Sequence, residues 1–122
     1  MRLIVCGGRH FNDQEFVFAA LNAVMTRKGI EMIIHGGSTP VDRWAEAWAH
    51  EHGIKAIAVP AKLHLFGPRA FPLRVTSMLR LHPDGVVAFP GSEGTESLVQ
   101  QAQAAGVKVW RPRKQAFAEV SH

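Results

Sequence analysis

Short apolar runs, three of which end in glycine-rich loops, restrict the fold of this chain more than any other feature of its sequence. Each run is too short for a helix and nearly uniformly apolar, which is typical of parallel strands covered on both faces. We predict five such strands: Leu3–Cys6, Met32–His35, Ala56–Val59, Val86–Phe89 and Val107–Trp110. Parallel strands share one carboxyl edge, so loops 5–9, 34–38 and 89–95 should open on the same side.

Segments with helical spacing separate the strands. Two apolar stripes repeat at helical intervals: Val17, Ala20, Leu21, Val24, Met25, and Val41, Trp44, Ala45, Trp48, Ala49. Further helices are expected at about 72–81 and 95–105. The segment Pro60–Pro72 has no clear period and is expected to be a loop over a site. The alternation predicts an α/β fold, a Rossmann-like three-layer sandwich with a central, mainly parallel sheet of about five strands.

Length and composition indicate one folded domain at residues 1–111, followed by a polar C-terminal tail at 112–122. The chain has 122 residues, of which 47% are hydrophobic and 20% charged. Its formal charge of +4 favours anionic partners but does not indicate which kind of anion is bound. Because Arg111, Arg113 and Lys114 form the only compact basic group, and lie close to the C-terminus, we interpret them as a solvated tail rather than a nucleic-acid-binding arm.

Cys6 is the single cysteine, which excludes an intramolecular disulfide, and its apolar neighbours predict a buried thiol. The apolar part of the N-terminus is too short for a signal peptide, and no run approaches membrane-spanning length. We therefore expect a cytoplasmic protein.

Glycine loops at strand ends favour a phosphorylated ligand, because they let main-chain N–H groups and helix N-termini approach an anion. The dinucleotide fingerprint and the P-loop pattern are both absent, so a dehydrogenase or kinase is disfavoured and no cofactor is predicted. His50 and His52 point to different faces of a helix, and no metal is predicted. Thr95 either caps a helix or also donates to phosphate.

Charged residues near these loops each have two interpretations. Arg74 and Arg9 either bind phosphate or are surface arginines that pair with carboxylates. Asp42 either caps a helix or accepts ribose hydroxyls. Glu93 and Glu96 are candidate catalytic acids or bases, although solvated carboxylates at a helix start are commoner.

Residues 86–95, VVAFPGSEGT, resemble the Pro-Gly-Gly-x-Gly-Thr loop of the SLOG superfamily, which includes LOG phosphoribohydrolases and DprA-like proteins. The segments VCGGRHFND, HGGSTPVDRWAEAWAHEHGI and PAKLHLFGPRAFPLRVTSM stand in the order of the small YspA-type branch, over about residues 2–110. With the last loop, the resemblance implies a nucleotide-binding site formed by Gly7, Gly8, Arg9, Gly36, Gly37, Asp42, Arg74, Gly91, Ser92, Gly94 and Thr95. Met78, like Arg74, matches the third segment of the family pattern.

The chain departs from the family pattern inside that site. Val75 replaces an Asn, Phe71 a Gly, Ser92 a glycine, and residues 38–41 replace a small Ala-Arg-Gly-Ala run. Leu98 stands where LOG hydrolases have a Glu. The phosphoribohydrolase reaction is therefore not simply carried over.

Three functions remain open. The favoured one is binding of a phosphorylated nucleotide or nucleotide-derived ligand, as a sensor or sequestering protein. The alternatives are LOG-like hydrolysis of an N-glycosidic bond and, least favoured, binding of single-stranded nucleic acid. The resemblance also implies a homo-oligomer, a dimer or higher.

Overall fold

A computed structural model describes residues 1–114 and places them in one α/β sandwich. The sheet has five parallel strands in the order β3-β2-β1-β4-β5. The strands are β1 Arg2–Cys6, β2 Met32–His35, β3 Lys55–Ala58, β4 Gly85–Ala88 and β5 Lys108–Trp110. All five were predicted from the sequence, with bounds that differ by at most a residue or so.

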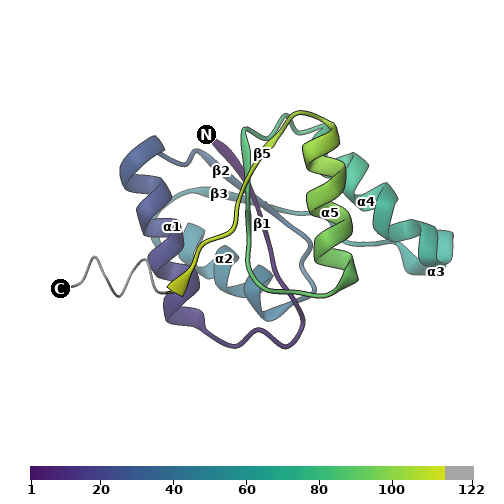
Figure 1. The fold of residues 1–122 in the computed structure, drawn as a ribbon, viewed down its shortest axis with the longest axis horizontal. Coiled ribbons are helices and arrows are strands. Elements are labelled where there is room, and N and C mark those ends of the chain that lie inside the picture. The colour runs from purple at the N-terminus through teal and green to yellow at the C-terminus, as the bar shows by residue number, and fades with distance from the viewer. Residues whose placement is uncertain (115–122) are drawn as a thin grey trace.

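Helices cover both faces of this sheet. They are α1 Gln14–Lys28, α2 Pro40–Glu51, the short α3 Leu63–Phe66, α4 Ala70–Leu79 and α5 Glu93–Ala104. Figure 1 shows α3, α4 and α5 together on the right of the sheet and α1 on its left. The predicted Rossmann-like sandwich is thus confirmed.

The strands contribute alternate residues to two apolar cores. Leu3 and Val5 of β1 pack with Val17 of α1 and Trp48 of α2 in one core. Ile4 of β1 packs on the other face with residues of α4 and α5, including Met78, Val75 and Leu98. Burial on both faces explains why the central strands β2, β1 and β4 are nearly continuous apolar runs.

The segment expected to be a loop between Pro60 and Pro72 is not one. It contains α3, then a 3₁₀ turn at Gly67–Arg69, and α4 already begins at Ala70. Pro72 occupies the first turn of α4, where its missing N–H costs no hydrogen bond. Proline spacing alone therefore gave a wrong prediction of an irregular segment.

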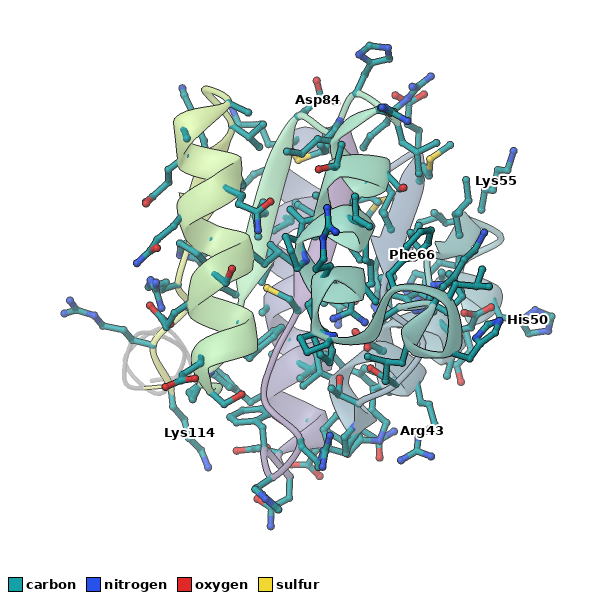
Figure 2. All side chains as sticks on the ribbon, turned by 90° about the vertical axis from the view of Figure 1, so that its right-hand side faces the viewer. Arg43, His50, Lys55, Phe66, Asp84 and Lys114 are labelled. Atoms are coloured by element: carbon teal, nitrogen blue, oxygen red, sulfur yellow. The ribbon has the colours of Figure 1, made fainter. Side chains whose placement is uncertain are left out.

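Between β1 and β4 the strand order changes direction, which is where ligands bind in open α/β sheets. Figure 2 shows Asp84, just before β4, at the upper end of the molecule, and Arg43 of α2 with Lys114 at the lower end. The carboxyl ends of the strands and the loops that follow them lie at this lower end. No helix within residues 1–114 is long and apolar enough to cross a membrane.

Candidate functional site

The first and last glycine loops are joined by their main chains. The Gly8 N–H donates to the Pro90 carbonyl over 2.9 Å. A Cβ on Gly8 would lie 2.6 Å from the Gly91 Cα, so only glycine permits this approach. The two loops that flank the switch point therefore form one continuous main-chain wall.

The second loop is fixed by His35. Its Nδ1 accepts the Gly37 N–H at 3.0 Å, and its Nε2 faces the carboxylate of Glu46. Since Nδ1 is an acceptor, the ring carries its proton on Nε2 and donates it to Glu46. His35 is thus a buried structural residue. Gly37 turns the chain with φ +72°, and it does not line the crevice described below.

Asp42 closes the start of α2. Its Oδ2 accepts the N–H groups of Ser38 and Thr39 at 3.0 and 3.1 Å, while Thr39 Oγ1 accepts the Asp42 N–H. This reciprocal arrangement is a capping box, and the carboxylate is buried. The protein's own carboxylate therefore accepts the two main-chain N–H groups that directly precede α2.

Arg74 extends from α4 toward the second loop. Its Nη1 would lie 2.7 Å from a Cβ on Gly36, so the guanidinium packs against that main chain. The guanidinium carbon also lies 5.6 Å from the centre of the Phe71 ring. Arg74 Nε is buried and has no hydrogen-bond partner among residues 1–114. A buried charged donor without a partner is costly, which marks a place where an acceptor is expected.

The start of α5 differs from the start of α2, since no side chain caps it. Thr95 is buried, and its Oγ1 would lie 2.1 Å from a Cβ on Gly91. The candidate acids Glu93 and Glu96 lie on the first turn but do not line the crevice. Arg111 forms a two-pronged ion pair with Glu96, at 2.8 and 2.9 Å, and lowers the pKa of this carboxyl.

These elements enclose a crevice of about 120 Å³. Nine of the eleven predicted ligand-binding residues line it: Gly7, Gly8, Arg9, Gly36, Asp42, Arg74, Ser92, Gly94 and Thr95. Its remaining lining includes Cys6, Met78 and Leu98, which are buried and apolar. Burial raises the pKa of the Cys6 thiol to about 12, so this group is protonated at neutral pH. Among the departures from the family pattern, Val75 does not line the crevice and packs in the core instead.

A larger cavity, of about 650 Å³, adjoins the crevice. It is lined by Gly8, Arg9, His10, Phe11, Pro90, Gly91 and Ser92, and its wall is mainly apolar. Gly8, Arg9 and Ser92 belong to both hollows. The two hollows therefore meet at the wall made by the first and last loops.

Sequence reasoning missed two residues at this edge. Phe11 was not considered, although it follows Gly7-Gly8-Arg9 directly and so had to lie near the first loop. Arg111 was assigned to a tail, yet it follows the parallel strand β5, whose carboxyl end lies at the same edge as the other strand ends. Lys114, also assigned to the tail, forms an ion pair with Asp13 at 2.8 Å. Residues 115–122 of the predicted tail lie outside the described part of the chain.

Comparison with known proteins agrees with the predicted resemblance. The family model YAcAr, described as the YspA, cpYpsA-related SLOG family, matches residues 1–66. The Gene 61 protein of Mycobacterium phage D29 is 31% identical over 116 residues, which cover 88% of this chain and 93% of that protein. No solved structure matches the chain significantly. The chain therefore belongs to the YspA, cpYpsA-related SLOG family.

Proposed function

We propose that this protein binds the phosphate group of a nucleotide or nucleotide-derived ligand in the crevice, as a sensor or sequestering protein. The observation that carries this proposal is Arg74. Its buried Nε has no partner within residues 1–114, and its side chain lines a crevice that also includes the uncapped start of α5. An anion between them would accept from both the guanidinium and the helix N–H groups.

The two helix starts at the crevice support a particular place for the phosphate. At α2 the N–H groups of Ser38 and Thr39 already donate to Asp42. At α5 no side chain takes that role, and the space over Gly94 is open. The phosphate is therefore assigned to the α5 side of the crevice, between Gly94 and Arg74, and the negative charge of Asp42 disfavours the α2 side.

Hydrolysis of the N-glycosidic bond has less support from this site. Leu98 places an apolar side chain in the crevice where LOG hydrolases have a Glu. Among the described residues Asp42 is the only carboxylate that lines the crevice, and two main-chain N–H groups hold its Oδ2. These hydrogen bonds give the carboxylate a structural role at the start of α2.

Thermal unfolding with AMP, ADP and adenosine tests the proposal. We expect the two nucleotides to raise the melting temperature and adenosine to raise it far less, because the crevice recognises charge. A free nucleotide concentration of about 100 times Kd should raise the free energy of unfolding by about 2.7 kcal/mol. Equal shifts with adenosine and AMP would contradict a phosphate site. The same samples are assayed for free adenine, whose release beyond one equivalent would favour the hydrolase alternative.

If a single-stranded oligonucleotide raised the melting temperature more than AMP does, the result would instead favour the nucleic-acid alternative. Such binding should weaken steeply as salt rises, because it releases many counterions at once.

A further inference from the structure

We infer that the larger cavity beside Phe11 is the site of the nucleobase, so that the ligand is a nucleotide held across the wall of the first and last loops. This inference rests on the proposed phosphate site. It adds which hollow takes the second half of the ligand and which side chain recognises it.

Size is the first argument. The crevice holds about 120 Å³, whereas ligand pockets for whole small molecules commonly hold about 300–1,000 Å³. A phosphate fits the crevice, but a complete nucleotide needs adjoining space. The cavity of about 650 Å³ supplies that space, and it shares Gly8, Arg9 and Ser92 with the crevice. A ligand anchored by its phosphate at α5 can therefore extend over this shared wall.

The rigidity of Phe11 is the second argument. Its ring packs against Phe89, with centroids 5.6 Å apart, and against Phe16, with centroids 6.2 Å apart. Its N–H donates to the Gly8 carbonyl at 3.2 Å, which ties the aromatic residue to the glycine wall. The ring is half-buried and lines the cavity. An aromatic face fixed before binding costs little entropy when a planar base stacks on it.

Chemical character is the third argument. The wall of the crevice is mainly polar and that of the cavity mainly apolar, which matches the phosphate and base ends of a nucleotide. Within residues 1–114 no Asp or Glu lines the cavity, while Arg9 and His10 do. Their N–H groups suit the carbonyl and ring-nitrogen acceptors of a nucleobase, whereas a second phosphate would prefer a polar wall.

Titration calorimetry with AMP and ribose 5-phosphate separates the two halves of the ligand. Wild-type protein should bind AMP more tightly than ribose 5-phosphate. Phe11→Leu keeps an apolar side chain against Phe16 and Phe89 but removes the aromatic face. We expect it to weaken AMP at least about fivefold, the lower end for loss of a stacking partner, and to leave ribose 5-phosphate unchanged.

Phe66→Leu is the matched control. Phe66 is an exposed phenylalanine on α3, labelled in Figure 2, and lines a third hollow, which shares only Arg74 with the crevice and no residue with the larger cavity. Its replacement should change neither titration. Arg74→Ala, by contrast, should weaken AMP and ribose 5-phosphate together, because both carry the phosphate.

Phe11→Trp provides a direct signal. A stacked base should quench the new indole fluorescence when AMP is added, while ribose 5-phosphate should not, and wild-type protein corrects for Trp44, Trp48 and Trp110. This variant also retains an aromatic face, so it should keep AMP affinity.

Equal binding of AMP and ribose 5-phosphate by wild-type protein, or an unchanged AMP affinity in folded Phe11→Leu, would overturn the base site and leave the phosphate site standing. Binding of neither compound would overturn both proposals. Should Phe11→Leu unfold, the fluorescence of Phe11→Trp decides, since AMP without quenching would place the base elsewhere.

Discussion

Arg74 supplies the sharpest test at the scale of single residues. Replacement by Ala should weaken phosphorylated ligands by about 1.5–3 kcal/mol, the range for hydrogen bonds to charged groups. Replacement by Lys should recover only part of that loss, since an ammonium keeps the charge but lacks the planar fork. Titration calorimetry with AMP on wild-type and both variants measures the effect.

Arg80→Ala is the control for this experiment, because Arg80 is an exposed arginine on the turn that ends α4 and does not line the crevice. It should leave AMP binding unchanged. Unaltered affinity in Arg74→Ala would move the phosphate site away from α4, with Arg9 as the next cation at the crevice.

Cys6 makes stability depend on pH in the alkaline range. Burial raises its pKa from 9.0 to about 12, so above pH 9 the unfolded state releases a proton that the folded state keeps. The stabilisation is fully present below the unfolded pKa and is lost as pH rises toward the folded one. Wild-type protein should therefore lose about 1 kcal/mol of unfolding free energy between about pH 8 and 10 relative to Cys6→Ser.

Urea unfolding of both proteins at each pH measures this loss. Cys6→Ser removes the titrating thiol at nearly constant shape, so its own pH dependence subtracts the contribution of all other groups. Parallel curves for the two proteins would show that the thiol ionises as readily in the folded state as in the unfolded one.

At the scale of elements, the start of α5 carries the next prediction. A Cβ on Gly94 would meet no atom within 4 Å, so the fold accepts a side chain there, but that side chain would extend into the crevice. Gly94→Val should therefore abolish the stabilisation by AMP while the domain remains folded. Thermal unfolding with and without AMP gives the comparison.

Ser97→Val on the same helix is the matched control, since Ser97 is exposed and does not line the crevice. A normal AMP shift in Gly94→Val would exclude the start of α5 from the site.

The hydrophobic pattern was enough to predict the strands and their parallel arrangement, because the central strands β2, β1 and β4 are buried on both faces and nearly all their residues are apolar. The positions of the glycines likewise predicted that loops 5–9, 34–38 and 89–95 lie at the same edge of the sheet. The ion pair between Arg111 and Glu96 was missed, since the residues lie in different elements and neither carries a local pattern. The helix predicted from about Pro72 begins at Ala70, because proline is compatible with the first turn of a helix as well as with a loop.

The occupied start of α2 is a further feature that pattern reasoning left open. Asp42 was predicted either to cap the helix or to contact ribose. Only the structure shows that its carboxylate accepts two main-chain N–H groups. At the start of α5, Ser92 stands at the N-cap position, but Thr95 occupies the place that corresponds to Asp42, and no side chain caps that helix.

At the scale of the whole molecule, residues 52–83 contain five Lys or Arg and no Asp or Glu. The same segment holds five of the seven large apolar side chains that are exposed within residues 1–114: Leu63, Leu65, Phe66, Phe71 and Leu73. We name these five residues the α3–α4 surface. The homo-oligomer implied by the resemblance stays a prediction, and this surface is where we expect the copies to meet.

Leu65→Glu should shift the mass in sedimentation toward the monomer, because a charge would be buried at the contact. Added salt should favour pairing of the wild-type protein, since cations on the two copies approach each other there. Met25→Glu, at the exposed end of α1, is the control. A monomeric wild-type protein at high concentration and high salt would contradict the prediction.

The central place of β1 has a consequence for how the molecule is made. β1 pairs with β2, some thirty residues later, and with β4, some eighty residues later. During synthesis the first half of the chain emerges with one edge of β1 unpaired, an arrangement that invites wrong pairing with other chains. The crevice has no last wall until β4 and the loop to α5 leave the ribosome. Ligand binding is thus expected only at a late stage of synthesis. A chain that ends before β4 lacks two of the five strands and one wall of the site.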